Sequence, residues 1–194
     1  MAPAVTPYPL QAEALEADLS PEEGRRLHAE FAAADEHDLM AVLSSTTPEA
    51  GGTASAVAEA VTAIADHHHR AGHPLRAYRW ALRAVDAGER AGAGAERLRL
   101  LRRAVRLREH VPDVEESTLD LLLRLRATAA SLGAHEDELA AVEAVLDLVD
   151  EAEKPLIVAE LLVRREHLRF STGRGFLRLD PARRAVALSE HNPT

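Results

Sequence analysis

The chain of 194 residues has a formal net charge of −9 at pH 7, and 46% of its residues are hydrophobic although only 3% are aromatic. The acidic balance argues against a general nucleic-acid-binding protein, and the absence of cysteine excludes disulfides, thiolate metal sites and a cysteine nucleophile. We find neither a signal peptide nor an apolar run of the roughly 20 residues that span a bilayer, which predicts a cytoplasmic protein. A composition rich in Ala, Leu, Glu and Arg favours helices throughout.

The N-terminal part of the chain predicts two helices before its clearest loop. A short helix is expected at residues 10–19, after a stretch that carries three prolines. The next helix opens with S-P-E-E, because Ser20 is a good N-cap, Pro21 suits the first helical position and Glu23 completes a capping box. Residues 44–53, S-S-T-T-P-E-A-G-G-T, follow as a loop.

A regular series of helical segments, separated by turns that contain Gly or Pro, fills the rest of the chain. These segments are expected at residues 54–71, 74–91, 95–111, 117–132, 136–149, 155–172 and 181–191. Short connections make neighbouring helices antiparallel, as hairpins. The spacing of the hairpins lies near the period of about 34 residues of tetratricopeptide (TPR) repeats.

Small residues support this repeat in its first hairpin, where two helices must approach closely. They are Ala65, Ala77, Ala81 and Ala84, with Gly72 at the turn. Later hairpins depart from the TPR pattern, because Arg97 and Glu138 stand where a small residue would be expected. We therefore predict an all-α fold of antiparallel helical hairpins stacked as a TPR-like α-solenoid.

Several stretches, in order and in register, resemble one family. The segment L-E-A-D-L-S-P-E-E-G-R-R-L-H-A-E-F-A, residues 15–32, resembles the exit from the ATPase module of large LuxR-type ATP-binding transcriptional regulators. A first repeat hairpin of that family is similar to A-I-A-D-H-H-H-R-A-G-H-P-L-R-A, residues 63–77. Its following helices are similar to residues 100–113, 132–151 and 183–189.

This resemblance implies a domain organisation. The regulators are longer, with an ATP-binding module before this region and a helix-turn-helix domain after it. Residues 1–50 would then be N-terminal helices that resemble the exit from a winged-helix and ATPase module, and residues 51–194 would be TPR-like repeats. The sequence has no G-x-x-x-x-G-K-[ST] motif and no helix-turn-helix signature, so no ATP-binding or base-contacting residue is carried over.

The function implied is that of a non-catalytic sensing or protein-interaction region of such a regulator, with no cofactor. Its partner would be a protein or a small-molecule effector, not nucleic acid and not a membrane. A homodimer through the apolar Val186 and Leu188 stays open. The alternative is a free-standing TPR-like adaptor that binds a peptide or protein partner.

The histidine-rich stretch A-I-A-D-H-H-H-R-A-G-H-P, residues 63–74, suggests a metal site at first sight. Consecutive residues of a helix diverge by about 100°, however, so three adjacent histidines cannot ligate one metal. We expect His68 to pack against the second helix near Ala77 or Ala81, and its two neighbours, His67 and His69, to face solvent. A metal-dependent hydrolase built on these histidines is the less favoured interpretation.

Two further groups are candidates for binding a partner. One is the arginine stripe, which shares one helix face and consists of Arg99, Arg102, Arg103 and Arg106. It is either an anion-binding patch or a solvated face paired with nearby acids. The other is Tyr78 with Trp80, which either fill the core or anchor a partner. The acids at residues 136–138 are expected on an exposed helix start, and we find no acid/base pair for catalysis.

Overall fold

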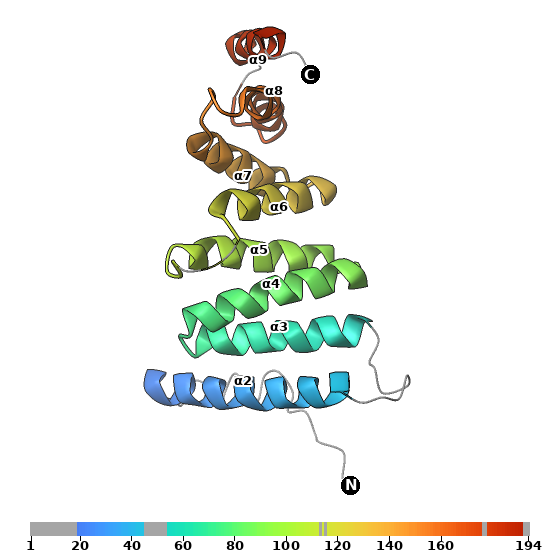
Figure 1. The fold of residues 1–194 in the computed structure, drawn as a ribbon, viewed down its shortest axis with the longest axis vertical. Coiled ribbons are helices and arrows are strands. Elements are labelled where there is room, and N and C mark those ends of the chain that lie inside the picture. Colours follow the sequence, from blue (N-terminus) through green and yellow to red (C-terminus); the bar gives the residue numbers. More distant parts are fainter. Residues whose placement is uncertain (1–18, 45–53, 113, 115, 176–177, 192–194) are drawn as a thin grey trace. The chain divides into compact units, whose positions relative to one another are not determined.

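The computed structural model describes residues 19–44, 54–112, 114, 116–175 and 178–191. Within these ranges the regular secondary structure consists of eight α-helices and includes no strand, which confirms the predicted all-α class (Figure 1). Residues 10–18 and 45–53, where we expected a short helix and a loop, lie outside the described residues.

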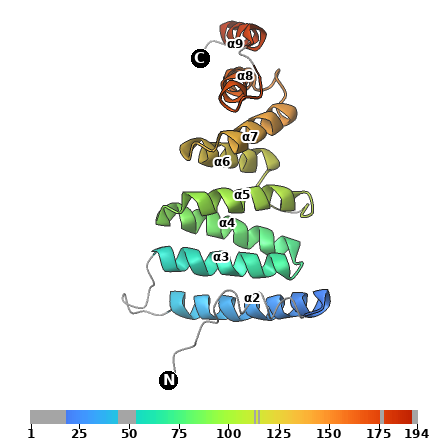
Figure 2. The same ribbon diagram turned by 180° about the vertical axis from the view of Figure 1, so that it is seen from behind.

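The chain divides into two compact units, Met1–Ala91 and Gly92–Thr194. The first contains α2 (Pro21–Ser44), α3 (Ala54–Arg70) and α4 (Pro74–Ala91). Its helices pack in chain order, α2 on α3 and α3 on α4 (Figure 2). Helix α2, which the sequence grouped apart from the repeats, thus packs on the first repeat helix within the same unit.

The start of α2 has the predicted capping box. The backbone N–H of Glu23 donates to Oγ of Ser20 at 3.3 Å, and the backbone N–H of Ser20 donates to Oε2 of Glu23 at 2.9 Å. Pro21 is the first helical residue, a position whose N–H has no hydrogen-bond partner within the helix, so the missing N–H of proline costs no hydrogen bond. The helix continues without interruption to Ser44.

The turn between α3 and α4 closes by backbone geometry that requires glycine. Gly72 has a φ of 75°, in the left-handed region that residues with a Cβ rarely adopt. Its N–H donates to the carbonyl of His69, and the N–H of His73 donates to the carbonyl of His68, at 3.1 and 3.0 Å. This pair of bonds is a Schellman motif, and it turns the chain directly into α4.

The second unit contains five helices that also pack in chain order. They are α5 (Gly94–Arg108), α6 (Thr118–Ser131), α7 (His135–Leu148), α8 (Pro155–Ser171) and α9 (Leu179–His191). Packing of each helix on its neighbours along the chain is the pattern of an α-solenoid, and it holds within each unit.

Helix α5 ends three residues before the predicted end at Val111. The N–H groups of His110 and Val111 donate to the carbonyls of Leu107 and Arg108, three residues back, so the last turn is tightened. Pro112 follows and restricts the residue before it to a non-helical conformation.

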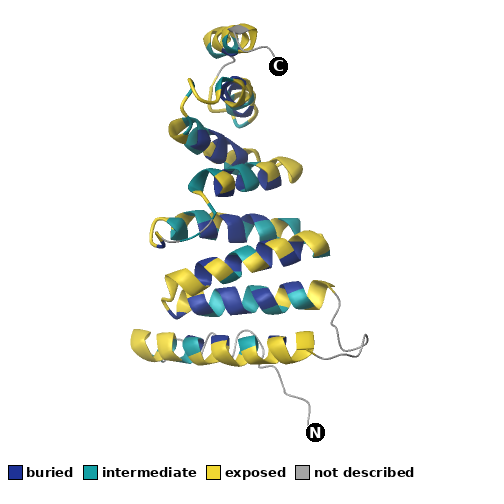
Figure 3. Cartoon of the chain, viewed as in Figure 1, coloured by how far each residue is buried: buried dark blue, intermediate teal, exposed yellow. Residues whose placement is uncertain are grey.

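Burial differs strongly between the helices of the first unit. The small residues expected at the close contact of α3 and α4, namely Ala65, Ala77, Ala81 and Ala84, are all buried. Helix α2 in contrast buries only His28, Ala32 and Leu39, and most of its length is exposed (Figure 3). The core of this unit therefore lies mainly between α3 and α4, and α2 packs on α3 with three buried side chains.

Among the residues that the structure describes, no helix combines the length and the apolar character needed to cross a membrane.

Candidate functional site

His68 on α3, which we expected to be half-buried against the second helix, is almost fully buried, with 1% of its surface exposed. Its Nε2 lies 2.6 Å from Oε1 of Glu36 on α2, so this nitrogen carries the hydrogen and the carboxylate accepts it. The same oxygen of Glu36 accepts the indole N–H of Trp80 on α4, at 2.8 Å. One carboxylate of α2 therefore receives donors from both helices of the hairpin. Ala77 and Ala81, the neighbours that we expected for His68, are buried as well.

The prediction that His67 faces solvent is wrong. Its Nδ1 lies 3.0 Å from Nδ1 of His28 on α2, and its Nε2 lies 3.7 Å from Oδ2 of Asp35. The ring of Phe31 packs beside it, with ring centroids 5.3 Å apart. His67 is consequently part of the contact between α2 and α3. The sequence could not show this, because it does not fix the register of one helix against the other.

His69 is exposed, and His67 and His68 face different groups of α2. In the described part of the chain, no cluster of three or more His, Cys, Asp or Glu has an arrangement that could hold a metal ion. The three adjacent histidines thus lie apart from one another in the way that helix geometry predicts.

Tyr78 and Trp80 differ in how far they are buried. Tyr78 is buried, with 1% of its surface exposed, so it belongs to the core and not to a partner surface. Trp80 is half-buried, and the guanidinium of Arg83 lies 4.6 Å from the centre of its ring. Its indole N–H is used within the unit by Glu36. Of the two, only Trp80 offers part of its ring to solvent.

Two of the four arginines of the stripe on α5 are paired with acids. Arg99 donates to Glu96 on the same helix at 2.9 Å, and Arg102 lies 3.2 Å from Asp137 on α7. Arg103 is half-buried and Arg106 is exposed. These pairs favour the interpretation of the stripe as a solvated face over that of an anion-binding patch.

Glu138 corrects a second prediction, because this acid is buried and not on an exposed helix start. Both of its carboxylate oxygens accept from Arg164 on α8, each at 2.7 Å. The hydrogen bond to Glu138 raises the pKa of Arg164 above its usual range, and burial opposes the shift. Where the TPR pattern would place a small residue, this chain has Glu138, whose ion pair with Arg164 joins α7 to α8.

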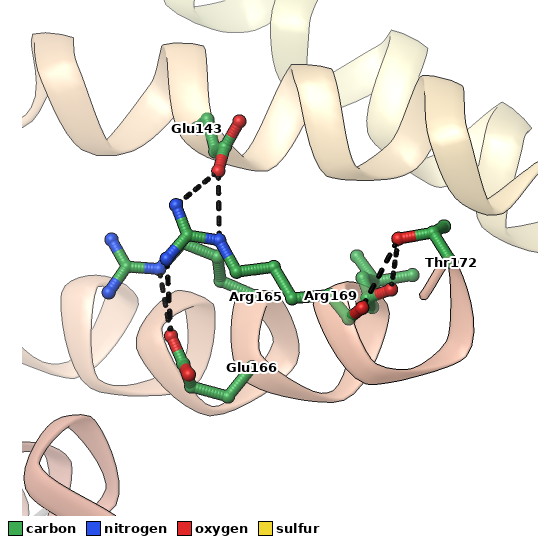
Figure 4. A network of polar contacts seen from close by, with 6 residues as sticks. Glu143, Arg165, Glu166, Arg169 and Thr172 are labelled. Carbon is green, nitrogen blue, oxygen red and sulfur yellow. Dashed lines mark hydrogen bonds and ion pairs between the residues drawn. The ribbon is translucent and has the colours of Figure 1, made fainter. Parts of the chain in front are cut away.

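A second arginine extends the contact between α7 and α8 (Figure 4). Arg169 on α8 donates to Glu143 on α7 through Nε at 3.1 Å and Nη2 at 2.6 Å. The buried Glu166, on α8 itself, lies 3.3 Å from Arg165 and 3.7 Å from Arg169. The Glu143–Arg169 pair and the Glu138–Arg164 pair therefore both join α7 to α8.

An open groove of about 880 Å³ lies between α8 and α9. Its apolar side chains include Val163 and Val186, which are 52% and 56% exposed. Polar side chains at the groove are Glu160, Arg164, His167, Ser189 and Glu190. Beneath it, Val158, Ala159, Leu162 and Ala185 form a buried cluster, against which Leu188 packs.

A smaller pocket of about 390 Å³ lies between α2 and α3. Short side chains on α3, including Ala56, Ala60 and Ala63, leave this space open. Opposite them, α2 contributes Leu39 and the carboxylate of Asp38. The pocket is therefore part of the contact between α2 and α3.

Comparison of the sequence with protein-family models gives no match, and comparison with curated proteins gives none either. The likeness to LuxR-type regulators accordingly rests on the residue patterns of the chain.

Proposed function

We propose that this chain is a non-catalytic protein-interaction region of helical repeats, and that the groove between α8 and α9 takes an amphipathic helix of a partner. The observation that carries the proposal is the groove itself, with Val163 and Val186 half-exposed beside a buried apolar cluster. Amphipathic helices bind such grooves through apolar residues spaced three and four apart.

Charge supports a basic partner helix. The chain carries a formal charge of −9, and two acids line the groove: Glu190, and Glu160, which is paired with Arg126 at 2.8 Å. The one arginine at the rim, Arg164, has its charge balanced by the buried Glu138. A helix with lysines flanking its apolar stripe therefore meets complementary charge, which favours encounter and orientation.

In this proposal the chain acts in the cytoplasm and binds its partner as the helical region of a LuxR-type regulator would. The free-standing adaptor remains the alternative. The reading frame around the coding sequence distinguishes the two, because a frame that continues into a helix-turn-helix domain supports the regulator. The region itself is expected to show no sequence-specific binding in a gel shift with DNA at moderate salt.

A designed peptide tests the groove directly. The probe is a fluorescently labelled helix of about 18 residues, five helical turns, with leucines at i, i+3, i+4 and i+7 and lysines elsewhere. Fluorescence anisotropy is expected to show saturable binding, and a peptide of the same composition with a scrambled stripe is expected to bind weakly.

Variants locate the binding site. Val163→Glu and Val186→Glu each place a charge in the groove, so both are expected to weaken binding at least about tenfold. Met40→Glu on α2 is the matched control, because Met40 is 58% exposed but lies in the first unit. Equal binding of the scrambled peptide, or equal loss in the Met40 variant, would contradict the proposal.

A further inference from the structure

The pocket between α2 and α3 is lined by facing stripes of the two helices. On α2 the lining residues recur at i, i+3, i+4 and i+7, so they share one face of the helix: Asp35, Asp38, Leu39 and Val42. On α3 they are Ala56, Val57, Ala60 and Ala63. Because the alanine side chains are short, a volume of about 390 Å³ stays open between the packed helices. Pockets that hold small molecules begin at about 300 Å³.

The walls of this pocket are apolar, with acids towards one end. Along α2 the two carboxylates come first, and Leu39 and Val42 follow them. Leu39 is 7% exposed, whereas Val42 is 40% exposed, so apolar surface remains accessible to a ligand. None of the described residues that line the pocket is basic. A ligand of this pocket therefore meets hydrocarbon on most sides and negative charge on one.

The negative charge of Asp35 and Asp38 is poorly balanced within the protein. Nε2 of His67 lies 3.7 Å from Oδ2 of Asp35, which is longer than a hydrogen bond. In the part of the chain that the structure describes, the carboxylate of Asp38 has no ion-pair partner. The two acids are neighbours on one helix face, where like charges repel. A cation that reaches both of them relieves this repulsion and finds free acceptor oxygens.

We propose that this pocket binds a small organic cation, an ammonium group on a compact hydrocarbon body. The ammonium group donates charge-assisted hydrogen bonds to Asp35 and Asp38, and the body packs between Leu39 and the alanines of α3. An anion is repelled by the same carboxylates. A sugar finds no other hydrogen-bonding side chain among the described lining residues. Because the ligand contacts both helices, its binding stabilises the packing of α2 on α3.

Three probes with the same hydrocarbon body and different charges test the proposal: adamantylamine, adamantanol and adamantane carboxylate. Each is titrated into the ¹⁵N-labelled whole chain at neutral pH, where the amine is a cation, and amide shifts are followed by NMR. The amine is expected to bind saturably, with shifts in α2 and α3, and at least about tenfold more tightly than the alcohol. The carboxylate is expected to bind most weakly.

Two variants separate charge from shape. Asp38→Asn keeps the shape of the side chain and removes its charge, so the affinity for the amine is expected to fall about tenfold while that for the alcohol stays the same. Glu30→Gln is the matched control, because Glu30 is an exposed acid of α2 away from the pocket lining, and it is expected to bind as the wild type does. Ala60→Leu fills the pocket and is expected to weaken the amine and the alcohol alike.

Circular dichroism of each variant checks that the helices persist, and the exposed Asp38 permits a test that does not disturb the core. The pocket belongs to the first unit, so the result is independent of the groove between α8 and α9. Absence of saturable binding of the amine, equal affinity for the amine and the alcohol, or unchanged binding in the Asp38 variant overturns the proposal. Shifts confined to α8 and α9 overturn it as well, because the amine would then occupy that groove.

Discussion

The contact between α2 and α3 and the contact between α7 and α8 both place ionisable residues between neighbouring helices, but the nitrogen groups come from histidine in the first and from arginine in the second. The first joins His67 of α3 to His28 and Asp35 of α2, and His68 of α3 to Glu36 of α2. The second joins arginines of α8 to Glu138 and Glu143. Arginine stays charged throughout the physiological range, whereas histidine changes its charge within it.

One chain of packed helices thus uses two kinds of side chain between neighbouring helices, arginine between α7 and α8 and histidine between α2 and α3. At the α7–α8 seam the arginines satisfy a carboxylate that is almost fully buried, so the pair has to persist for the helices to stay together. At the α2–α3 seam the attached helix is mostly exposed, so its loss leaves the core of α3 and α4 in place. The experiments below test this contrast, from the largest expected effect to the smallest.

Removal of the arginine from the buried pair is expected to have the largest effect. Arg164→Ala leaves the carboxylate of Glu138 buried without its partner and should lower the free energy of unfolding by about 3 kcal/mol. Urea denaturation followed by circular dichroism measures the change. Arg126→Ala is the control, because Arg126 pairs with the exposed Glu160 and should cost about 1 kcal/mol or less. If both variants cost the same, the α7–α8 seam does not depend on its buried ion.

Two substitutions of His68 separate packing from hydrogen bonding at the other seam. His68→Ala opens a cavity and removes a donor from Glu36, so it should cost about 2 to 3 kcal/mol in the same urea experiment. His68→Phe keeps a ring of similar size, and Glu36 still accepts from Trp80, so its cost should be about 1 kcal/mol or less. A phenylalanine variant as unstable as the alanine variant would show that the hydrogen bond, not the ring, holds this position.

The smallest effect concerns the first turn of α2. Hydrogen bonds from the side chain and backbone of Ser20 hold the pKa of Glu23 below its ordinary value of 4.5. Because the folded pKa is depressed, this contact stabilises the helix start at neutral pH, and the stabilisation is lost as pH falls below 4.5. A ¹³C NMR titration of the carboxyl group measures the shift. Ser20→Ala should return the pKa of Glu23 towards 4.5, and an unchanged titration would contradict the capping box.

Local signals in the sequence were sufficient for most helix boundaries. Helix α4 begins at Pro74 and ends at Ala91, as predicted, because proline favours the first helical turn and Gly92 follows with a φ of 71°. The capping box of Ser20 and Glu23 is likewise encoded within four residues. The burial of His68 followed from its spacing relative to Ile64 and Ala65 on the same helix.

Contacts between helices could not be predicted in the same way. The sequence does not reveal that Glu138 meets Arg164, because the two residues are 26 positions apart and their meeting depends on the register of α7 against α8. The same limit explains why His67 was expected to face solvent. It also explains why Glu36 was not recognised as the acceptor of the hydrogen bond from His68. A charged residue at a position that the repeat pattern reserves for small ones was the only available signal for Glu138.

The hydrogen bond from Trp80 to Glu36 also means that the fluorescence of Trp80 reports on the first unit. Trp80 is the single tryptophan of the chain, and its indole joins α4 to α2 while Arg83 lies over its ring. The emission of this one fluorophore therefore reports the environment at the attachment of α2 without any label. Steady-state fluorescence can accordingly follow the docking of that helix in real time, in the unmodified protein and at low concentration.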